Sequence, residues 1–148
     1  MTVLFVCTGN TCRSPMAACL FNGLCEASGL RGFRALSAGT DAMSGMGASD
    51  GARRAMEKRG LTLAAHRSRP VTEDLLAGVD LVVGVSERHL QRLRARFPTV
   101  GAPMRAFDPP IADPYGGSDE TYERTARELE PQIAALLQLL SIEGGTCQ

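Results

Sequence analysis

One short stretch near the N-terminus combines residue types that bind phosphate with a possible nucleophile. It reads LFVCTGNTCRSPMA, residues 4–17, and joins a strand-like run to a helix-like run. In such a loop, backbone N–H groups and the positive end of the helix dipole converge on one point. Gly9 permits a positive φ and Asn10 tolerates one, while the planar fork of Arg13 matches two phosphate oxygens. The stretch therefore predicts a site for a dianion shaped like phosphate.

Cys7 lies in the same positive field, so its thiol is expected to be ionised at neutral pH. Lowering a thiol pKa by about two units takes roughly 2.7 kcal/mol of preferential stabilisation of the thiolate. A helix end, several amides and the Ser14 hydroxyl together can supply this. Such a sulfur anion predicts in-line attack on phosphorus and a phosphocysteine intermediate. A buried, unreactive cysteine is the alternative, and the Cys-x5-Arg-Ser spacing between strand and helix argues against it.

Expulsion of an oxygen or nitrogen leaving group also needs a proton donor, which is usually a carboxylic acid. The late segment IADPYGG supplies Asp113, and Asp108 lies five residues earlier in FDPP. Aspartates before proline are also common as simple turn residues. Composition and spacing alone leave both candidates for the general acid open.

These residues must be held by a regular scaffold, which the hydrophobic pattern describes. Short apolar, β-prone runs predict strands, and apolar residues at helical spacing predict helices. Strands are expected at residues 2–6, 33–38, 80–85 and 104–107. Helices are expected from residue 15 to a stop at Gly29, at 50–59, at 86–97 and at about 119–140, with a short one after a Thr72 cap in VTEDLLAGVD.

Strands that alternate with helices predict an α/β fold with three layers, in which helices cover both faces of a four-stranded parallel sheet. We expect a single phosphate-processing domain over residues 1–148, with a frayed tail from about 143. In such sheets a ligand lies beyond the carboxyl ends of the strands, where the loop 7–14 falls. Ser14 is expected to cap the first helix, with the proline after it at the first helical position. Pro131 is expected to kink or divide the last helix.

The composition limits the class of protein. Of the 148 residues 44% are apolar, and the formal net charge is zero without a long basic run, so no nucleic-acid partner is expected. No apolar stretch approaches the roughly 20 residues of a membrane span, so no membrane association is expected. The start does not read as a signal peptide, which predicts a cytoplasmic protein.

The cysteines argue for reduced thiols. There are five of them, an odd number, and four fall within the first 25 residues, which is unlike a secreted disulfide framework. No metal site is expected, because the spacings are not those of zinc ligands and both histidines lie far from the cysteines.

Together these residues resemble a known family. VCTGNTCRSPMA looks like the signature loop of the low-molecular-weight protein tyrosine phosphatases. SAGT, AAHRSRPV, DLVVGVSERHL and DPYGGSDETYE fall where that family has similar segments, so the resemblance covers nearly the whole chain. It implies that Cys7 is the nucleophile and that Arg13 holds the phosphoryl oxygens. It also implies that Asp113, not Asp108, is the general acid.

The same resemblance implies supporting roles. Ser14 would lower the thiol pKa, and Asn10, Ser37 and His66 would brace the loop from behind. Cys12 is expected either to form a reversible disulfide with the oxidised nucleophile or simply to fill space under the loop. The residues expected to bind substrate are Thr8, Gly9, Asn10, Thr11, Cys12, Ser14 and Tyr115.

Two further features of the chain are expected to have no catalytic part. His89 is expected on an exposed helix face. The arginines at positions 88, 92, 94 and 96 are expected to form a solvated face that at most contacts other proteins.

The rim of the predicted site bears on the substrate. Thr11 stands where tyrosine-directed members usually carry a larger aliphatic residue, and the bacterial protein-arginine phosphatases of the family resemble this sequence in CTGNTCRS and DP-aromatic-GGS. The threonine hydroxyl should favour a planar guanidinium over a phenyl ring, with Asp113 able to pair with it. The loop 41–48 also lacks an aromatic residue to stack on a phenol. Against this, Tyr115 stands where tyrosine-directed members also have tyrosine.

The sequence thus favours a cysteine-dependent protein phosphatase that leans toward phosphoarginine, with a phosphotyrosine phosphatase as the alternative. A thiol-linked arsenate reductase shares the fold but needs further cysteines, and residues 26–146 contain none. A non-catalytic phosphate-binding or redox-sensing module is disfavoured by the retained acid. The expected partners are phosphorylated proteins, with inorganic phosphate as product or inhibitor. No metal or organic cofactor is expected, because thiolate, arginine, amides and acid complete the chemistry.

Overall fold

Four parallel strands form the central sheet of the computed structural model, which describes residues 1–145. The strands are β1 (Thr2–Cys7), β2 (Arg34–Gly39), β3 (Leu81–Gly84) and β4 (Met104–Ala106), in the order β2-β1-β3-β4. The helices are α1 (Arg13–Ala27), α2 (Asp50–Glu57), α3 (Glu73–Ala77), α4 (Glu87–Arg96) and α5 (Asp119–Gly145). Val3 pairs with Ala35 of β2 and with Leu81 of β3, so β1 lies inside the sheet.

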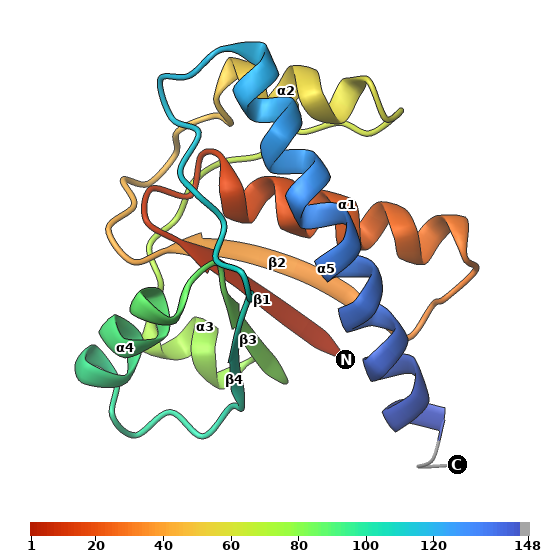
Figure 1. The fold of residues 1–148 in the computed structure, drawn as a ribbon. Coiled ribbons are helices and arrows are strands. Elements are labelled where there is room, and N and C mark those ends of the chain that lie inside the picture. Colours follow the sequence, from red (N-terminus) through yellow and green to blue (C-terminus); the bar gives the residue numbers. More distant parts are fainter. Residues whose placement is uncertain (146–148) are drawn as a thin grey trace.

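The alternation of side chains along β1 divides the core into two halves. Val3 and Phe5 belong to a cluster with apolar residues of α1, α2 and α5. Leu4 and Val6 belong to a second cluster with residues of α3 and α4. Figure 1 shows the resulting layers, with α1 and α5 on one side of the sheet and α3 and α4 on the other. The predicted α/β fold, with a four-stranded parallel sheet between helices, is therefore confirmed.

The last helix is the clearest departure from the predicted elements. Pro131 lies inside α5, which is one continuous helix, so the predicted division is wrong, while the alternative, a kink at this proline, stays a prediction. Leu129 and Ile133 on either side are buried in the core shared with α1, and this packing offsets a mid-helix cost of about 3 kcal/mol. The helix also extends to Gly145, past the predicted start of the frayed tail, and 146–148 lie outside the described residues.

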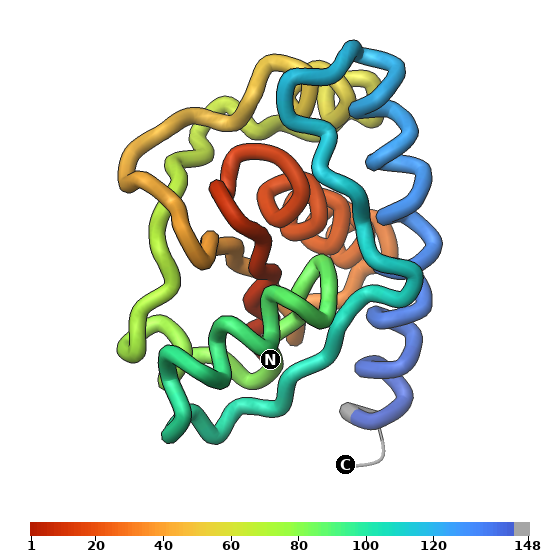
Figure 2. Tube along the Cα trace, turned by 60° about the vertical axis from the view of Figure 1, so that its left-hand side comes forward, coloured from red at the N-terminus to blue at the C-terminus, as the bar shows by residue number. Residues whose placement is uncertain are grey.

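The loop 7–14 lies where the carboxyl ends of β1 and β2 meet. Cys7 is the last residue of β1, and it pairs with Gly39, the last residue of β2. In Figure 2 the red turn after β1 lies between the orange 40–48 segment and the cyan 107–118 segment. Segments that are far apart in the sequence thus converge around this loop, as the parallel topology predicts.

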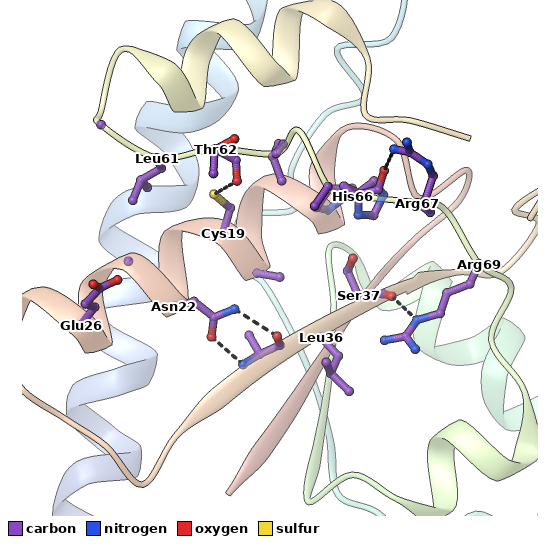
Figure 3. Close-up of a pocket in the computed structure, with 17 residues that line it drawn as sticks. Cys19, Asn22, Glu26, Leu36, Ser37, Leu61, Thr62, His66, Arg67 and Arg69 are labelled. Atoms are coloured by element: carbon purple, nitrogen blue, oxygen red, sulfur yellow. Dashed lines mark hydrogen bonds between the residues drawn. The ribbon is translucent and has the colours of Figure 1, made fainter. Parts of the chain in front are cut away.

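Strand β2 forms one edge of the sheet, and side chains occupy its outward-facing backbone. Asn22 of α1 accepts a hydrogen bond from the Ala35 N–H at 2.8 Å and donates one to the Ala35 carbonyl oxygen at 3.1 Å. Arg69 Nε donates to the Ser37 carbonyl oxygen at 3.1 Å, and Figure 3 shows both contacts. The opposite edge is β4, which has only three residues.

Candidate active site

The loop 7–14 leads from β1 directly into α1, which begins at Arg13. Cys12 is the N-cap residue, and it makes no side-chain capping hydrogen bond. The prediction that Ser14 caps this helix is wrong. Ser14 lies within the first turn of α1, and its hydroxyl is 2.8 Å from the Cys7 sulfur. The positive end of the α1 dipole is therefore left facing the loop.

Cys7 ends β1 and is almost completely buried. Burial is the largest influence on its thiol and raises the pKa. Hydrogen bonding by Ser14, the charge of Arg13 and the Asn10 backbone act in the lowering direction, as does the helix dipole. The predicted ionisation of this thiol at neutral pH is not borne out by these contacts, because burial outweighs them.

Asn10 holds the loop 7–14 in place through hydrogen bonds to Ser14, Ser37, His66 and Arg69. It is fully buried and has a left-handed backbone with φ 58°, which asparagine adopts more readily than most residues. Its side-chain nitrogen donates to the hydroxyls of Ser14 at 2.9 Å and Ser37 at 3.0 Å. Its side-chain oxygen accepts from the Arg69 N–H at 3.0 Å, and its carbonyl oxygen accepts from His66 Nε2 at 2.8 Å. The structure thus brings the three predicted bracing residues together.

Two of the bracing residues, Ser37 and His66, also line a pocket of about 690 Å³ behind the loop, between α1, β2 and the 60–69 segment (Figure 3). Burial lowers the pKa of His66, the charges of Arg69 and Arg67 act in the same direction, and the bond to the Asn10 carbonyl opposes them. The imidazole is therefore neutral at pH 7, with Nε2 carrying the proton that it donates to the loop.

Gly39 is a site residue that sequence reasoning missed. A β-carbon at this position would lie 2.4 Å from the Thr8 carbonyl oxygen and 3.1 Å from the Asn10 nitrogen. The loop 7–14 therefore rests directly on the end of β2, and any side chain there would displace it. The only sequence signal is a glycine at the end of a strand, which equally suits an ordinary turn.

Arg13 is held beside the loop by contacts from two sides. Its NH1 group donates to the Ile111 carbonyl oxygen at 3.0 Å, and its NH2 group donates to Thr8 Oγ1 at 3.5 Å. NH2 also lies 3.7 Å from the carboxylate of Asp113. The guanidinium is mostly buried, so its charge acts at close range on the loop and on the acid.

The two candidate acids occupy different positions. Asp113 lines the same cleft as Cys7, its side chain is half-exposed, and its Oδ1 accepts from the Tyr115 N–H at 3.1 Å. Asp108 lines a neighbouring hollow that includes Arg13 but not Cys7. The geometry therefore favours Asp113 as the acid near the sulfur.

The cleft over Cys7 has a volume of about 330 Å³ and an apolar rim. Met43, Met46 and Tyr115 line it and are 73%, 50% and 74% exposed. All but one of the predicted substrate contacts line this cleft, namely Thr8, Gly9, Asn10, Thr11, Cys12 and Tyr115. The exception is Ser14, which is fully buried next to the sulfur. The two methionines were missed, because nothing in a glycine-rich stretch marks them as site residues.

Cys12 packs under the loop against other elements. Its sulfur lies 3.1 Å from the Ser49 hydroxyl and 3.5 Å from the Tyr122 hydroxyl. Among the described residues, the thiols of Cys7, Cys12, Cys19 and Cys25 are free. The contacts of Cys12 suit the space-filling alternative, and its redox role stays a prediction.

His89 corrects the expectation of an exposed, inactive histidine. It is buried, and its Nε2 lies 2.9 Å from the Thr8 hydroxyl. The physical reason is that α4 packs on the sheet through His89, Leu90 and Leu93, which share one side of the helix. A polar residue at the margin of that stripe could not be assigned to either side from the sequence.

The arginines of α4 are exposed, as expected, but most are engaged in ion pairs. Arg92 lies 3.0 Å and Arg96 3.7 Å from the Asp41 carboxylate, which lines the cleft. Arg94 pairs with Glu87 at 2.9 Å. The helix is therefore tied to the 41–48 segment by charge.

Within residues 1–145, no group of three or more His, Cys, Asp or Glu side chains is arranged to hold a metal ion. None of the helices in the range has both the length and the apolar character to cross a membrane.

Comparison with known proteins identifies the family. The family model described as low molecular weight phosphotyrosine protein phosphatase matches residues 2–144. The chain belongs to this family. The resemblance read from the signature loop is thus confirmed, and the molecule is a protein phosphatase that acts on phosphoproteins.

This phosphatase has relatives of two kinds. It is 35% identical to the protein-arginine-phosphatase of Bacillus subtilis, over 95% of this chain and 97% of the relative. It is 34% identical to a low molecular weight protein-tyrosine-phosphatase of Streptomyces coelicolor, over 91% of this chain and 90% of the relative. Among solved structures, a YwlE arginine phosphatase mutant with a phosphorylated active-site serine matches with a TM-score of 0.90 and 33% identity, over 95% of this chain and 96% of the other.

Proposed function

We propose that this phosphatase hydrolyses phosphoarginine in proteins through a phosphocysteine intermediate. Cys7 is the nucleophile, Arg13 binds the phosphoryl group and Asp113 is the general acid. The observation that carries the proposal is that Cys7 and Arg13 of the loop 7–14 line one cleft with Asp113, which comes from a distant segment. The phosphorylated active-site serine of the YwlE mutant supports a covalent phosphoryl intermediate in a relative of this fold.

The first step transfers the phosphoryl group to sulfur. The Cys7 thiolate attacks phosphorus in line with the bond to the guanidino nitrogen. The S–P bond forms as the P–N bond breaks, and Asp113 gives its proton to the departing nitrogen. Amides of the loop 7–14 and the Arg13 guanidinium stabilise the negative charge on the phosphoryl oxygens.

The second step regenerates the enzyme. A water molecule attacks phosphorus, and the Asp113 carboxylate takes the water's proton. The S–P bond breaks, which releases inorganic phosphate and returns Cys7 to the thiolate. Inorganic phosphate is therefore a product and an expected inhibitor. Ser14, Arg13 and the helix N-terminus all favour the anionic sulfur, so they reduce the cost that burial puts on ionising the thiol.

Three features support phosphoarginine as the substrate. Thr11, which carries a hydroxyl, lines the cleft, and Asp113 offers a carboxyl oxygen that can accept a hydrogen bond from a guanidinium. The 41–48 segment contributes methionines rather than aromatic rings to the rim. One relative, from Bacillus subtilis, is a protein-arginine-phosphatase. Phosphotyrosine is the second candidate substrate, because the exposed ring of Tyr115 at the rim can stack on a phenyl ring.

The test is a side-by-side assay on two peptides that differ only in carrying phosphoarginine or phosphotyrosine. We expect kcat/KM to be at least about tenfold higher for phosphoarginine, because a site built for polar contacts rejects a partner that leaves them unpaired. Thr11→Ile should shift the ratio toward phosphotyrosine, and Thr99→Ile, at an exposed position, is the matched control. A preference for phosphotyrosine in the wild-type protein would overturn the substrate assignment.

A further inference from the structure

His89 is a buried titratable side chain that the proposed reaction does not use. It lies on α4, outside the loop 7–14, and is 6% exposed. Both ring nitrogens have partners, since Nδ1 lies 2.7 Å from the Ser86 hydroxyl and Nε2 lies 2.9 Å from the Thr8 hydroxyl. The ring is therefore fixed in orientation, and one of its partners directly follows the nucleophile in the chain.

The Thr8 hydroxyl connects His89 to the arginine of the site. Arg13 NH2 donates to Thr8 Oγ1 at 3.5 Å, so this oxygen is shared between the two side chains. The NH1 group of the same guanidinium is anchored to the Ile111 carbonyl oxygen at 3.0 Å. One anchor of the guanidinium is thus a backbone carbonyl, and the other is a side-chain hydroxyl, whose O–H direction depends on its hydrogen-bond partners.

The imidazole suits this task because it is neutral. Burial lowers the pKa of His89 to about 4, and the positive charges of Arg13, Arg88 and Arg92 act in the same direction. Asp113 acts in the raising direction. A neutral imidazole can bond two hydroxyls without adding a positive charge beside the guanidinium, so the support is constant between about pH 5 and 8.

We propose that His89 is a positioning residue for phosphate binding. Its ring holds the Thr8 hydroxyl, and the hydroxyl holds the Arg13 guanidinium in place. The proposal rests on the proposed function, because it concerns the same phosphoryl site. Within the described residues, the hydrogen bonds of the His89 ring go to Thr8 and Ser86 and not to the sulfur or the acid, so its loss should affect binding of the phosphoryl group first.

The experiment measures the affinity for inorganic phosphate by calorimetry and kcat/KM on a phosphoarginine peptide. His89→Ala should weaken phosphate binding about tenfold, which is the scale of one lost hydrogen bond to a charged site. His89→Gln, whose amide can reach Thr8 from the Nε2 position, should restore most of this affinity. Gln91→Ala, at an exposed position on the same helix, is the matched control and should bind phosphate like the wild type.

A double-mutant cycle with Thr8→Val separates positioning from general support of α4. Valine keeps the shape of threonine without the hydroxyl, so His89→Ala should cost little further affinity in that background. If His89→Ala does not fold, His89→Asn, which is too short to reach Thr8, replaces it. Additive losses, or wild-type phosphate affinity in the His89 variants, would overturn the positioning role. A wild-type protein that does not bind phosphate would overturn the proposed function itself.

Discussion

The loop 7–14 and the rim of the cleft border the same small volume, yet they are held differently. In the loop, Cys7, Asn10 and Ser14 are buried and connected by hydrogen bonds that reach β2 and the 66–69 segment. At the rim, Met43 and Tyr115 stand mostly in solvent. The loop therefore has one available arrangement, whereas the rim side chains can adapt to what lies against them.

This difference separates the chemistry from the choice of substrate. In the proposed reaction, the buried and hydrogen-bonded loop acts on the phosphoryl group, which every substrate shares. A solvated rim contacts the part of the substrate that varies, and each contact contributes little. Substitutions in the loop should therefore be severe and uniform across substrates, and substitutions at the rim should be mild and selective.

The largest effect is expected at the base of the loop. Cys7→Ser should lower turnover by at least about 10⁴-fold on every substrate, because the proposed nucleophile is lost. Phosphate should still bind, since Arg13 and the amides are unchanged. Initial rates on an aryl phosphate and calorimetry with phosphate provide the measurement. Cys19→Ser, on the part of α1 that lines the pocket behind the loop, is the control and should keep the wild-type rate. Comparable rates in the Cys7 variant would end the covalent mechanism.

Asp113 stands between the two regions, because it lines the cleft but is half-exposed. Asp113→Asn should slow substrates with poor leaving groups by about 10²- to 10³-fold, and substrates with good leaving groups much less, because only the former need a proton. Steady-state rates on a series of aryl phosphates of graded acidity measure this. Asp108→Asn is the matched control, and a larger loss there would move the acid to that position.

A smaller effect is expected from the hydroxyl that supports the sulfur. Ser14→Ala removes a hydrogen bond that lowers the pKa of Cys7, so this pKa should rise. Since the thiolate is the reactive form, the ascending limb of kcat/KM against pH should shift to higher pH, by about one unit for roughly 1.4 kcal/mol. The pH dependence of Cys7 alkylation gives the pKa directly. Ser141→Ala, a helical serine on α5, is the control. If the ascending limb of kcat/KM against pH does not shift, the Ser14 hydroxyl does not affect the pKa of the Cys7 thiol.

The smallest effects are expected at the rim. Met43→Ala and Tyr115→Ala should each raise KM by about two- to fivefold, because each removes a limited apolar contact. The changes should differ between phosphoarginine and phosphotyrosine peptides, while the pKa of Cys7 stays the same. Ile142→Ala removes an exposed apolar side chain on α5 as a control. If either substitution lowers kcat/KM by about 100-fold or more, the rim takes part in the chemistry.

The fold and the centre of the site were predictable because they depend on local patterns. Alternating strands and helices predict a parallel sheet, and the spacing of Cys7 and Arg13 across one turn predicts the phosphate site. Asn10 was recognisable because few residues tolerate its backbone conformation.

The remaining features depend on contacts between distant segments. Gly39 matters because β2 happens to end beneath the loop, and His89 because α4 turns that residue toward Thr8. Ser14 was misassigned as a cap because the same hydroxyl can serve a helix end or a neighbouring sulfur, and only the three-dimensional arrangement decides. Local sequence contains the candidates for such roles but not their partners.

The hydrogen bonds between the Asn22 amide and the Ala35 backbone affect how the protein behaves at high concentration. A sheet whose outermost strand offers free N–H and C=O groups invites a neighbouring molecule to dock as an additional strand, which is a first step toward aggregates. Here a helix side chain imitates that additional strand and occupies its place. Removing this amide should therefore make the protein self-associate at high concentration, even though the residue lies outside the catalytic cleft.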